Sequence, residues 1–220
     1  MDVEPPSGQF GCVVKCGITG ELIGPPNLHG YDARIREMIN ARFPEMTEAA
    51  YRSKIEMVRE QEKPDGAFPT CPFPNPEIKQ VFECALEMTK TEKADLLLAT
   101  DPDCDRIGIA VPDGNGFKKL SGNELGFMLM DYILKARSAQ NDIPEGAITV
   151  RSIVSSPLAD RIAEHYGVTM KTVLTGFKYI AEQIYLYETT GCNTFQFGFE
   201  ESFGYLSGTD VRDKDGVNAC

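Results

Sequence analysis

Two apolar runs enclose three regularly spaced aspartates in the stretch Leu96-Leu97-Leu98-Ala99-Thr100-Asp101-Pro102-Asp103-Cys104-Asp105-Arg106-Ile107-Gly108-Ile109-Ala110-Val111. The runs predict two short buried strands, over 96–99 and 107–111, joined by a tight loop. Asp101, Asp103 and Asp105 alternate along that loop. Three like charges this close repel one another unless a cation lies among them. The loop is therefore predicted to bind a metal ion.

The type of ligand indicates which metal is expected. Carboxylate oxygens on a short loop suit Mg2+, which favours octahedral geometry and commonly keeps a position for a phosphate oxygen. Arg106 adds a fixed positive charge beside the metal, and its planar guanidinium suits a phosphoryl group. We therefore expect Mg2+ as the cofactor and a phosphate-bearing ligand next to it.

The acidic loop has three competing interpretations. An acidic surface turn is the usual fate of Asp-Pro-Asp, but strict alternation between two apolar strands favours a metal site. A calcium-binding EF-hand loop needs Gly at its sixth position and Glu at its twelfth, where this chain has Arg106 and Pro112. An aspartyl-nucleophile phosphatase loop reads Asp-x-Asp-x-Thr or Asp-x-Asp-x-Val, and Asp105-Arg106 departs from that pattern.

Composition limits the class of protein. The chain has 220 residues, 42% of them hydrophobic and 25% charged, which suits one large globular domain or two modest ones. The net charge of −11 argues against nucleic acid and against an anionic membrane surface as partners. No apolar run approaches the length of a membrane span, and the acidic first residues are unlike a signal peptide. The seven cysteines show no paired zinc spacing, so a reducing cytoplasm is the expected location.

Hydrophobic periodicity predicts the remaining secondary structure. Helices are expected over 33–43, 77–91, 121–136, 157–166 and 175–186. Further strands are expected over 55–58, 117–120, 147–154, 168–173 and 194–199. Ser121 and Glu124 have the spacing of a capping box at the start of the third helix.

Two connecting segments complete the predicted organisation. The proline-rich segment 65–76 excludes regular structure, and Phe68 and Phe73 indicate that it is an ordered, packed loop. A polar connection containing Gly and Pro, over 138–146, is the expected domain boundary. It separates two domains, at 1–138 and 147–220.

Three polar features in the second half of the chain have both a structural and a functional interpretation. Gly176 opens a helix, where backbone N–H groups can bind an anion. Glu200 and Glu201 end a strand, either as a charged surface cap or as acceptors for sugar hydroxyls. Lys214 stands in a run of four charges, which could be no more than an exposed turn.

Five segments occur in a fixed order: Pro64-Asp65-Gly66-Ala67-Phe68-Pro69-Thr70, then Asp101-Pro102-Asp103-Cys104-Asp105-Arg106, then Thr175-Gly176-Phe177-Lys178, then Phe199-Glu200-Glu201-Ser202-Phe203-Gly204, and finally Arg212-Asp213-Lys214-Asp215-Gly216. Over residues 60–216 they resemble the α-D-phosphohexomutases, the phosphoglucomutase and phosphomannomutase family, and most closely its phosphoglucomutase branch. The resemblance implies an α/β fold with two mixed-sheet α/β domains of the phosphohexomutase type. These would be the second and most of the third of the family's four domains.

The resemblance also implies the metal ligands and the catalytic residues. Asp101, Asp103 and Asp105 would hold Mg2+. Arg106 would lie beside the phosphate, and Lys214 would be a candidate for proton transfer or for stabilising phosphate charge.

A second set of residues is implied as the substrate-binding site. Glu200 and Ser202 would contact the sugar of a hexose phosphate, and Thr175 and Gly176 would provide further sugar contacts.

The implied reaction is an intramolecular phosphoryl transfer that interconverts glucose 1-phosphate and glucose 6-phosphate through a bisphosphorylated sugar. In the resembling enzymes a phosphoserine on the first domain donates the phosphoryl group. The 220 residues contain neither a Ser-His-Asn-Pro-type serine loop nor the phosphate loop of the last domain. We therefore expect no turnover by this chain alone, and partner domains on a longer chain. The alternatives are a non-catalytic Mg2+ and sugar-phosphate binding remnant, a phosphomannomutase and a phosphopentomutase.

Overall fold

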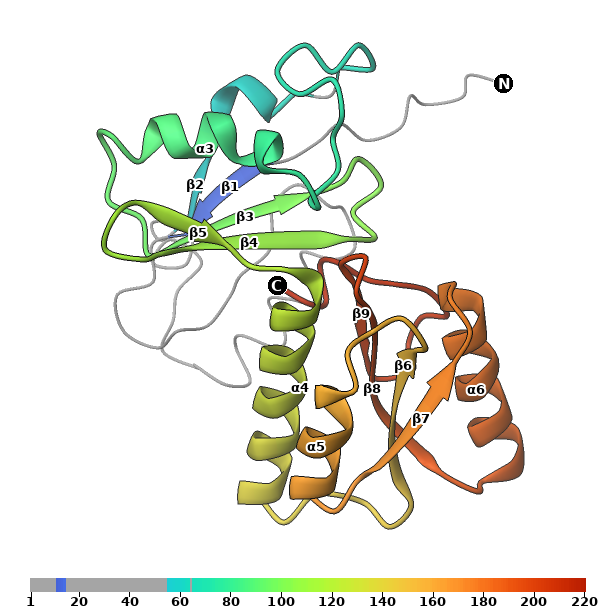
Figure 1. Ribbon diagram of the computed structural model, residues 1–220. Helices are drawn as coiled ribbons and strands as arrows, with labels where there is room; N and C mark the ends of the chain where they lie inside the picture. The colour runs from blue at the N-terminus through green and yellow to red at the C-terminus, as the bar shows by residue number, and fades with distance from the viewer. Residues whose placement is uncertain (1–10, 15–54, 64) are drawn as a thin grey trace, which may run out of the picture. The chain divides into compact units, whose positions relative to one another are not determined.

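The computed structural model of the chain describes residues 11–14, 55–63 and 65–220 (Figure 1). The chain divides into two compact units, Met1–Lys119 with Cys220 and Leu120–Ala219. Each unit contains one β-sheet with helices, so the predicted α/β class is confirmed. The helix predicted over 33–43 lies outside the described residues.

The first unit contains a five-stranded sheet in the order β2-β1-β3-β4-β5, and its neighbouring strands all pair antiparallel. The strands are β1 Gly11–Val14, β2 Ile55–Met57, β3 Leu96–Thr100, β4 Ile107–Pro112 and β5 Phe117–Lys119. The two predicted apolar strands are β3 and β4. They pair with each other directly, with Thr100 opposite Ile107, so the acidic loop closes a hairpin at one end of the sheet.

Short helical turns cover one face of this sheet (Figure 1): η1 Arg59–Gln61, η2 Lys79–Phe82 and α3 Glu83–Met88. Phe82 and Ala85 pack in one core with Leu97 and Ala99 of β3. The helix predicted over 77–91 is therefore found at the predicted position, but it is shorter and consists of η2 followed by α3. It begins as a 3-10 turn, and Ile78, which precedes it, makes no side-chain capping hydrogen bond.

The proline-rich segment is ordered, but its packing differs from the prediction. Phe68 is half-buried, whereas Phe73 is 72% exposed, and Cys71 and Pro76 are buried. The carbonyl oxygen of Phe73 accepts from the Cys71 thiol at 3.3 Å and from the Asn75 N–H at 2.8 Å. These bonds turn the backbone inward and the Phe73 ring outward, so the prediction that this ring packs is wrong.

The second unit is built on a mixed four-stranded sheet in the order β7-β6-β8-β9. Its strands are β6 Ala147–Ser152, β7 Thr169–Val173, β8 Thr194–Glu200 and β9 Gly204–Ser207. Strand β6 pairs parallel with β7 and with β8, while β9 returns antiparallel to β8. The predicted βαβ pattern is therefore confirmed.

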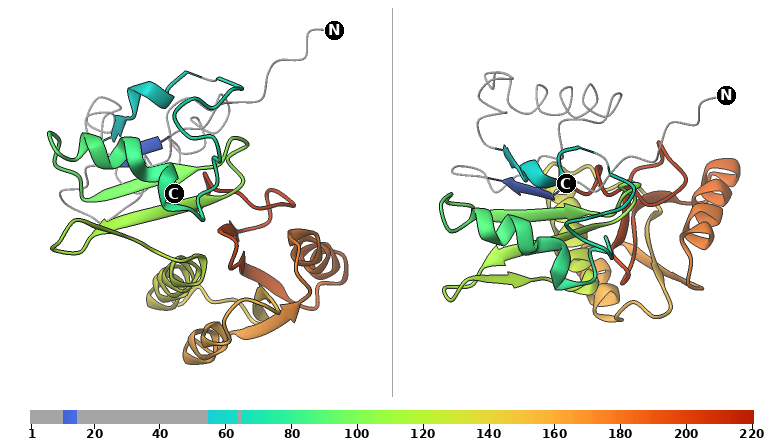
Figure 2. Two further views of the ribbon diagram at one scale, coloured as in Figure 1. Left: turned by 45° about the horizontal axis from the view of Figure 1, so that its top comes forward. Right: turned by 90° about the horizontal axis from the view of Figure 1, so that it is seen from above.

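Helices cover both faces of this sheet. They are α4 Gly122–Ala139, α5 Leu158–His165 and α6 Phe177–Thr190. Figures 1 and 2 show α4 and α5 together on one face and α6 on the opposite face. This two-layer cover explains why nearly every residue of β6 and β8 is buried.

A β-bulge distributes the aromatic residues of β8 between the two helical layers. Phe195, Phe197 and Phe199 alternate in sequence, and in a regular strand they would share one face. The register against β6 skips Gln196, which is the extra residue of the bulge. Phe195 consequently packs in the core beneath α6. Phe199 instead meets Phe127 of α4, with ring centroids 6.2 Å apart.

Helix α4 begins with the predicted capping box. The Ser121 hydroxyl accepts from the Glu124 N–H at 3.2 Å, and the Ser121 N–H donates to the Glu124 carboxylate at 2.7 Å. These bonds satisfy two backbone donors that the helix itself leaves without partners.

The position of α4 shows that the domain boundary lies earlier in the chain than predicted. This helix lies wholly within the second unit, where a Cβ on Gly126 would overlap the Phe199 ring of β8 and where the Tyr205 hydroxyl donates to the Gly122 carbonyl at 2.9 Å. The division falls between Lys119 and Leu120, not at 138–146. The expected limits of 1–138 and 147–220 assigned α4 to the first domain, because the polar segment after it looked like a linker. In the structure that segment is the loop from α4 to β6.

Two further observations concern the described part of the chain. None of its helices combines the length and the apolar composition needed to cross a membrane. Five of its cysteines are free thiols, Cys71, Cys84, Cys104, Cys192 and Cys220, and of these Cys71 and Cys104 are buried.

Candidate metal centre and substrate-binding turn

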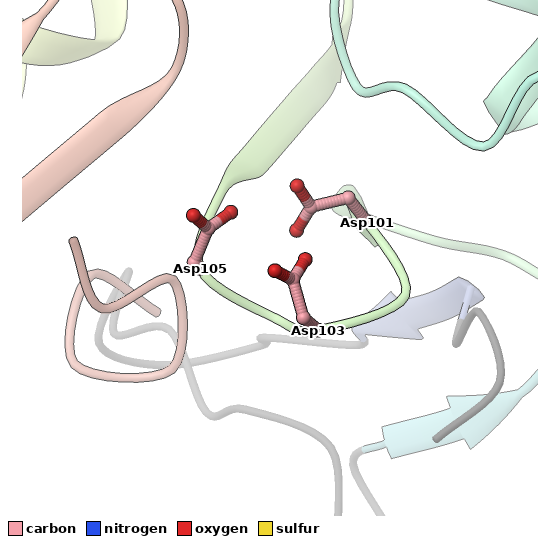
Figure 3. Close-up of side chains that lie close together, drawn as sticks. All are labelled: Asp101, Asp103 and Asp105. Carbon is pink, nitrogen blue, oxygen red and sulfur yellow. The ribbon is translucent and has the colours of Figure 1, made fainter. Parts of the chain in front are cut away.

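The loop between β3 and β4 brings its three aspartates together. Within the part of the chain that the structure describes, Asp101, Asp103 and Asp105 form the one cluster with the composition of a metal site, and their ligand oxygens all lie within 4.8 Å of one another. Figure 3 shows the three carboxylates pointing toward a common centre. Asp101 is buried, Asp105 is half-buried and Asp103 is exposed, so the centre is open on one side.

Local backbone geometry produces this convergence. The Cys104 N–H donates to the Asp101 carbonyl at 3.1 Å, which closes a turn, and Cys104 adopts a φ of 57°. The Cys104 side chain is buried, with its sulfur 3.5 Å from the Thr100 hydroxyl. The loop is thus anchored through its cysteine while its aspartates face one another.

The electrostatics of the cluster fit a divalent cation. The pKa of Asp101 is raised to about 6, first by burial and then by a hydrogen bond with Asp105, while hydrogen bonds from Arg106 oppose the rise. A carboxyl pair of this kind shares a proton, which a cation can replace. The donors are all carboxylate oxygens, the ligand type of Mg2+ and other hard divalent ions. The residues present therefore fit the expected metal.

Arg106 is bound to the cluster itself. Its Nε donates to Asp101 Oδ2 at 2.6 Å and its backbone N–H to Asp101 Oδ1 at 3.0 Å. Its Nη1 lies 3.2 Å from Glu77 Oε1 and 3.4 Å from Asn75 Oδ1. The guanidinium thus orients the Asp101 carboxylate and ties the acidic loop to the proline-rich segment. That Arg106 also lies beside a phosphate stays a prediction.

In the second unit, Glu200 and Gly176 meet directly. The Gly176 N–H donates to Glu200 Oε1 at 2.6 Å, and Glu200 is only 7% exposed. Gly176 precedes α6 with a φ of 109°, a conformation that favours glycine. The Gly176 N–H, which we expected to be available to an anion, is thus occupied by a carboxylate of the chain.

Lys214 lies close to this carboxylate. Its charge lowers the pKa of Glu200, although burial is the larger influence and the net direction is upward. The ammonium group lies 5.9 Å from the centre of the Phe177 ring and 3.5 Å from Asp213 Oδ1. The side chain runs across Gly204, where a Cβ would overlap it.

The structure therefore brings together Gly176, Glu200 and Lys214 of the predicted set in the second unit. Thr175 is exposed beside Gly176, and Ser202 is half-buried in the turn that follows Glu200. Their contacts with a sugar remain predictions.

Some polar residues around these features were not predicted. Asn75 and Glu77 bind Arg106, and Ser152 and Ser155 bind Glu201. The signal in the sequence was weak. Ser152 ends the buried strand β6 and Ser155 lies just after it, which is where ligand or loop contacts gather in α/β sheets, but such serines are common in ordinary turns.

Two α/β units, one with three converging aspartates and one with Lys214 near Glu200, have the architecture expected of two domains of a phosphohexomutase. Comparison with known proteins agrees. The family model described as "Phosphoglucomutase/phosphomannomutase, alpha/beta/alpha domain II" matches residues 40–114, and the model for domain III matches residues 121–220. The chain belongs to the phosphoglucomutase/phosphomannomutase family. The start of the second match agrees with the unit boundary at Leu120.

Individual relatives carry both names. A Haemophilus influenzae protein named "Probable phosphomannomutase" is 38% identical over 193 residues, which are 87% of this chain and 35% of that protein. A phosphoglucomutase of Staphylococcus aureus is 39% identical over 192 residues, which are 87% of this chain and 32% of that protein. The chain thus spans about a third of the length of these relatives.

A solved structure supports the fold. A phosphoglucomutase/phosphomannomutase family protein from Burkholderia thailandensis superimposes with a TM-score of 0.54 at 19% identity. The superposition covers 71% of this chain and 31% of that chain.

Proposed function

We propose that the chain supplies the metal-binding and sugar-binding domains of a phosphohexomutase that interconverts hexose 1-phosphates and hexose 6-phosphates, glucose phosphates first among them. The observation that carries the proposal is the convergence of three aspartate oxygens at one hairpin loop. Membership of a family whose members are named for glucose and mannose phosphates supports it. The proposal places the enzyme in the cytoplasm, with neither nucleic acid nor a membrane as a partner, in keeping with the net charge of −11.

The proposed reaction moves phosphoryl groups without net hydrolysis. A phosphoserine on another domain passes its phosphoryl group to the free hydroxyl of a hexose monophosphate; that hydroxyl loses its proton, and the serine oxygen takes one up. The phosphoryl group at the other end of the bisphosphorylated sugar then moves to the serine hydroxyl, which loses its proton, and the sugar oxygen left behind takes one up. Such transfers depend on positioning and on neutralising charge.

In this proposal the first unit of the chain neutralises phosphate charge. Asp101, Asp103 and Asp105 would hold Mg2+, which supplies positive charge for a phosphoryl group. Arg106 fixes the orientation of the buried Asp101 carboxylate.

The second unit would bind the sugar. The remaining lone pairs of the Glu200 carboxylate suit sugar hydroxyls, with Ser202, Thr175 and the Gly176 backbone close by along the chain. Lys214 places a cation next to Glu200, where it can stabilise phosphate charge or move the hydroxyl proton.

Sugar binding can be tested on the 220-residue chain. We would follow backbone amide shifts by NMR while titrating glucose 6-phosphate, mannose 6-phosphate or ribose 5-phosphate in the presence of Mg2+. Saturable shifts are expected around Gly176, Glu200 and Lys214, with a hexose phosphate preferred over the pentose phosphate. Lys214→Ala should weaken binding by about tenfold, as expected for a charged hydrogen bond. Lys171→Ala, which removes an exposed lysine of β7, should leave it unchanged.

The proposal would be contradicted if no sugar phosphate shifted these amides, or if both lysine variants behaved alike. A coupled assay of glucose 1-phosphate isomerisation supplements the titration. We expect the chain to bind without turnover, since its sequence contains no serine loop of the implied type.

A further inference from the structure

Glu200 and Glu201 are neighbours in sequence but have different partners. Glu200, the last residue of β8, accepts from the Gly176 N–H. Glu201 Oε2 instead accepts from the hydroxyls of Ser152 at 2.8 Å and Ser155 at 3.1 Å. The two neighbouring carboxylates thus bind different segments of the second unit.

The backbone of Glu201 is also fixed, by a hydrogen bond and by close packing. Its N–H donates to the Ser155 hydroxyl at 3.1 Å, so Ser155 bonds both the main chain and the side chain of one residue. On another side, α4 begins at Gly122, where a Cβ would overlap the Glu201 carbonyl group. The first residue of the turn 201–203 is therefore enclosed by hydrogen bonds and by close packing.

The two serines form a rigid base for these bonds. Ser152 and Ser155 are 0% and 1% exposed, and their hydroxyl oxygens lie 2.8 Å apart. Arg151 Nη1 donates to both of their carbonyl oxygens, at 3.2 and 3.0 Å. The same guanidinium forms a two-pronged pair with Asp160 of α5, at 2.7 and 3.0 Å. Both serines are thus fixed to the end of β6, independently of Glu201.

We propose that Glu201 is a positioning residue, which holds the turn after β8 against the end of β6 so that Glu200 and Ser202 are correctly oriented for the sugar of a hexose phosphate. Glu201 itself does not contact the sugar, because its carboxylate is directed at buried serines. This inference rests on the proposed function, which assigns sugar binding to Glu200 and Ser202. The hydrogen bonds of Glu201 explain how the turn keeps one orientation although Ser202, within it, is only half-buried.

The test compares Glu201→Ala with the conservative variant Glu201→Gln in the 220-residue chain. The glutamine side-chain carbonyl can still accept from the serine hydroxyls, and its NH2 group can donate, whereas alanine can do neither. Glu182→Ala is the matched control, because it removes an exposed carboxylate of α6 from the same unit. Ser155→Ala removes the serine partner of the same hydrogen bonds, and it replaces Glu201→Ala in the test if that variant does not fold.

Two readouts are measured. The first is glucose 6-phosphate affinity in the presence of Mg2+, and the second is the NMR shift of the Gly176 amide proton without ligand. That proton reports the hydrogen bond from the Gly176 N–H to the Glu200 carboxylate. We expect Glu201→Ala to weaken binding by about tenfold or more and to move the Gly176 proton upfield. Glu201→Gln should stay within about threefold of the parent chain, and Glu182→Ala should match it.

Two results would overturn the inference. One is a folded Glu201→Ala or Ser155→Ala chain with unchanged affinity and an unchanged Gly176 shift. The other is a Glu201→Gln chain as weak as Glu201→Ala, which would make the charge rather than the hydrogen bonds responsible. If the parent chain binds no hexose phosphate, the proposed function fails, while the Gly176 shift still decides the positioning role.

Discussion

Divalent-metal affinity at the acidic loop should depend on pH in a way that ordinary aspartates would not produce. The pKa of Asp101 is raised from 3.8 to about 6, first by burial and then by its hydrogen bond with Asp105. Roughly one tenth of such a group is ionised at pH 5 and roughly nine tenths at pH 7. Because the metal binds the ionised form, Mg2+ affinity should rise about tenfold between these pH values and level off above pH 7.

Isothermal titration calorimetry with Mg2+ at pH 5, 6 and 7, at constant ionic strength, measures this slope. Glu77→Gln is the control, because it removes an acidic partner of Arg106 and leaves the three aspartates intact. It should keep the tenfold slope. A carboxylate with a pKa of about 4 would lose less than about a tenth of its ionised form at pH 5. A nearly flat affinity profile would therefore refute the argument that Asp101 is buried beside a second carboxyl.

The ionisation of Asp101 should also affect the stability of the metal-free chain. Whereas Mg2+ affinity rises with pH, the contribution of Asp101 to stability should fall. The folded pKa of Asp101 is the higher one, so its contribution is present below its ordinary value of 3.8 and is lost as pH rises through about 6. Added Mg2+ should restore stability above pH 6, because it binds the folded, ionised cluster.

Two substitutions test the packing that holds the two candidate features. Tyr205→Phe deletes the hydroxyl that donates to Gly122 and should lower the unfolding free energy of the second unit by about 1 kcal/mol, while Tyr185→Phe, at an exposed ring, should not change it. Urea unfolding followed by amide NMR checks this, and equal stability of both variants would contradict the assignment of α4 to the second unit. Gly108→Ala places a methyl group 2.9 Å from the Pro76 carbonyl oxygen and should destabilise the first unit by about 1–3 kcal/mol in the same assay. A neutral result would mean that the proline-rich segment does not pack closely on β4.

The acidic hairpin loop was predictable from sequence because each of its features is local. Two apolar runs of strand length and three alternating acids specify a hairpin with its charges at the turn, and β3 and β4 have this arrangement. The capping box at Ser121 was predictable for the same reason, since it joins residues three positions apart, and the βαβ order was predictable because each of its elements has its own local hydrophobic pattern.

The features that sequence did not reveal depend on contacts between distant segments. Helix α4 belongs to the second unit because Gly126 and Gly122 allow close approach to β8 and to the turn after it, and a glycine in a helix does not show which partner it meets. Arg106 was expected beside a phosphate, but Glu77 and Asn75 come from a segment about thirty residues away and bind its outer nitrogen.

The bulge in β8 is a further example. Phe195, Phe197 and Phe199 predict one aromatic face, and only pairing with β6 shows that Gln196 is skipped. The Glu201–serine contact likewise joins positions 46 and 49 residues apart.

Mg2+ titration of the parent chain and of the Asp103→Asn variant tests whether the three aspartates of the acidic loop bind a divalent cation. Asp103 is the exposed member of the triad, so its replacement removes a ligand with little effect on folding. Asp95→Asn removes an exposed aspartate of the same unit as the matched control. We expect saturable binding of one Mg2+ per chain, weakened at least about tenfold by Asp103→Asn and unchanged by Asp95→Asn. Absence of saturable binding in the parent chain, or equal affinity in all three proteins, would contradict it.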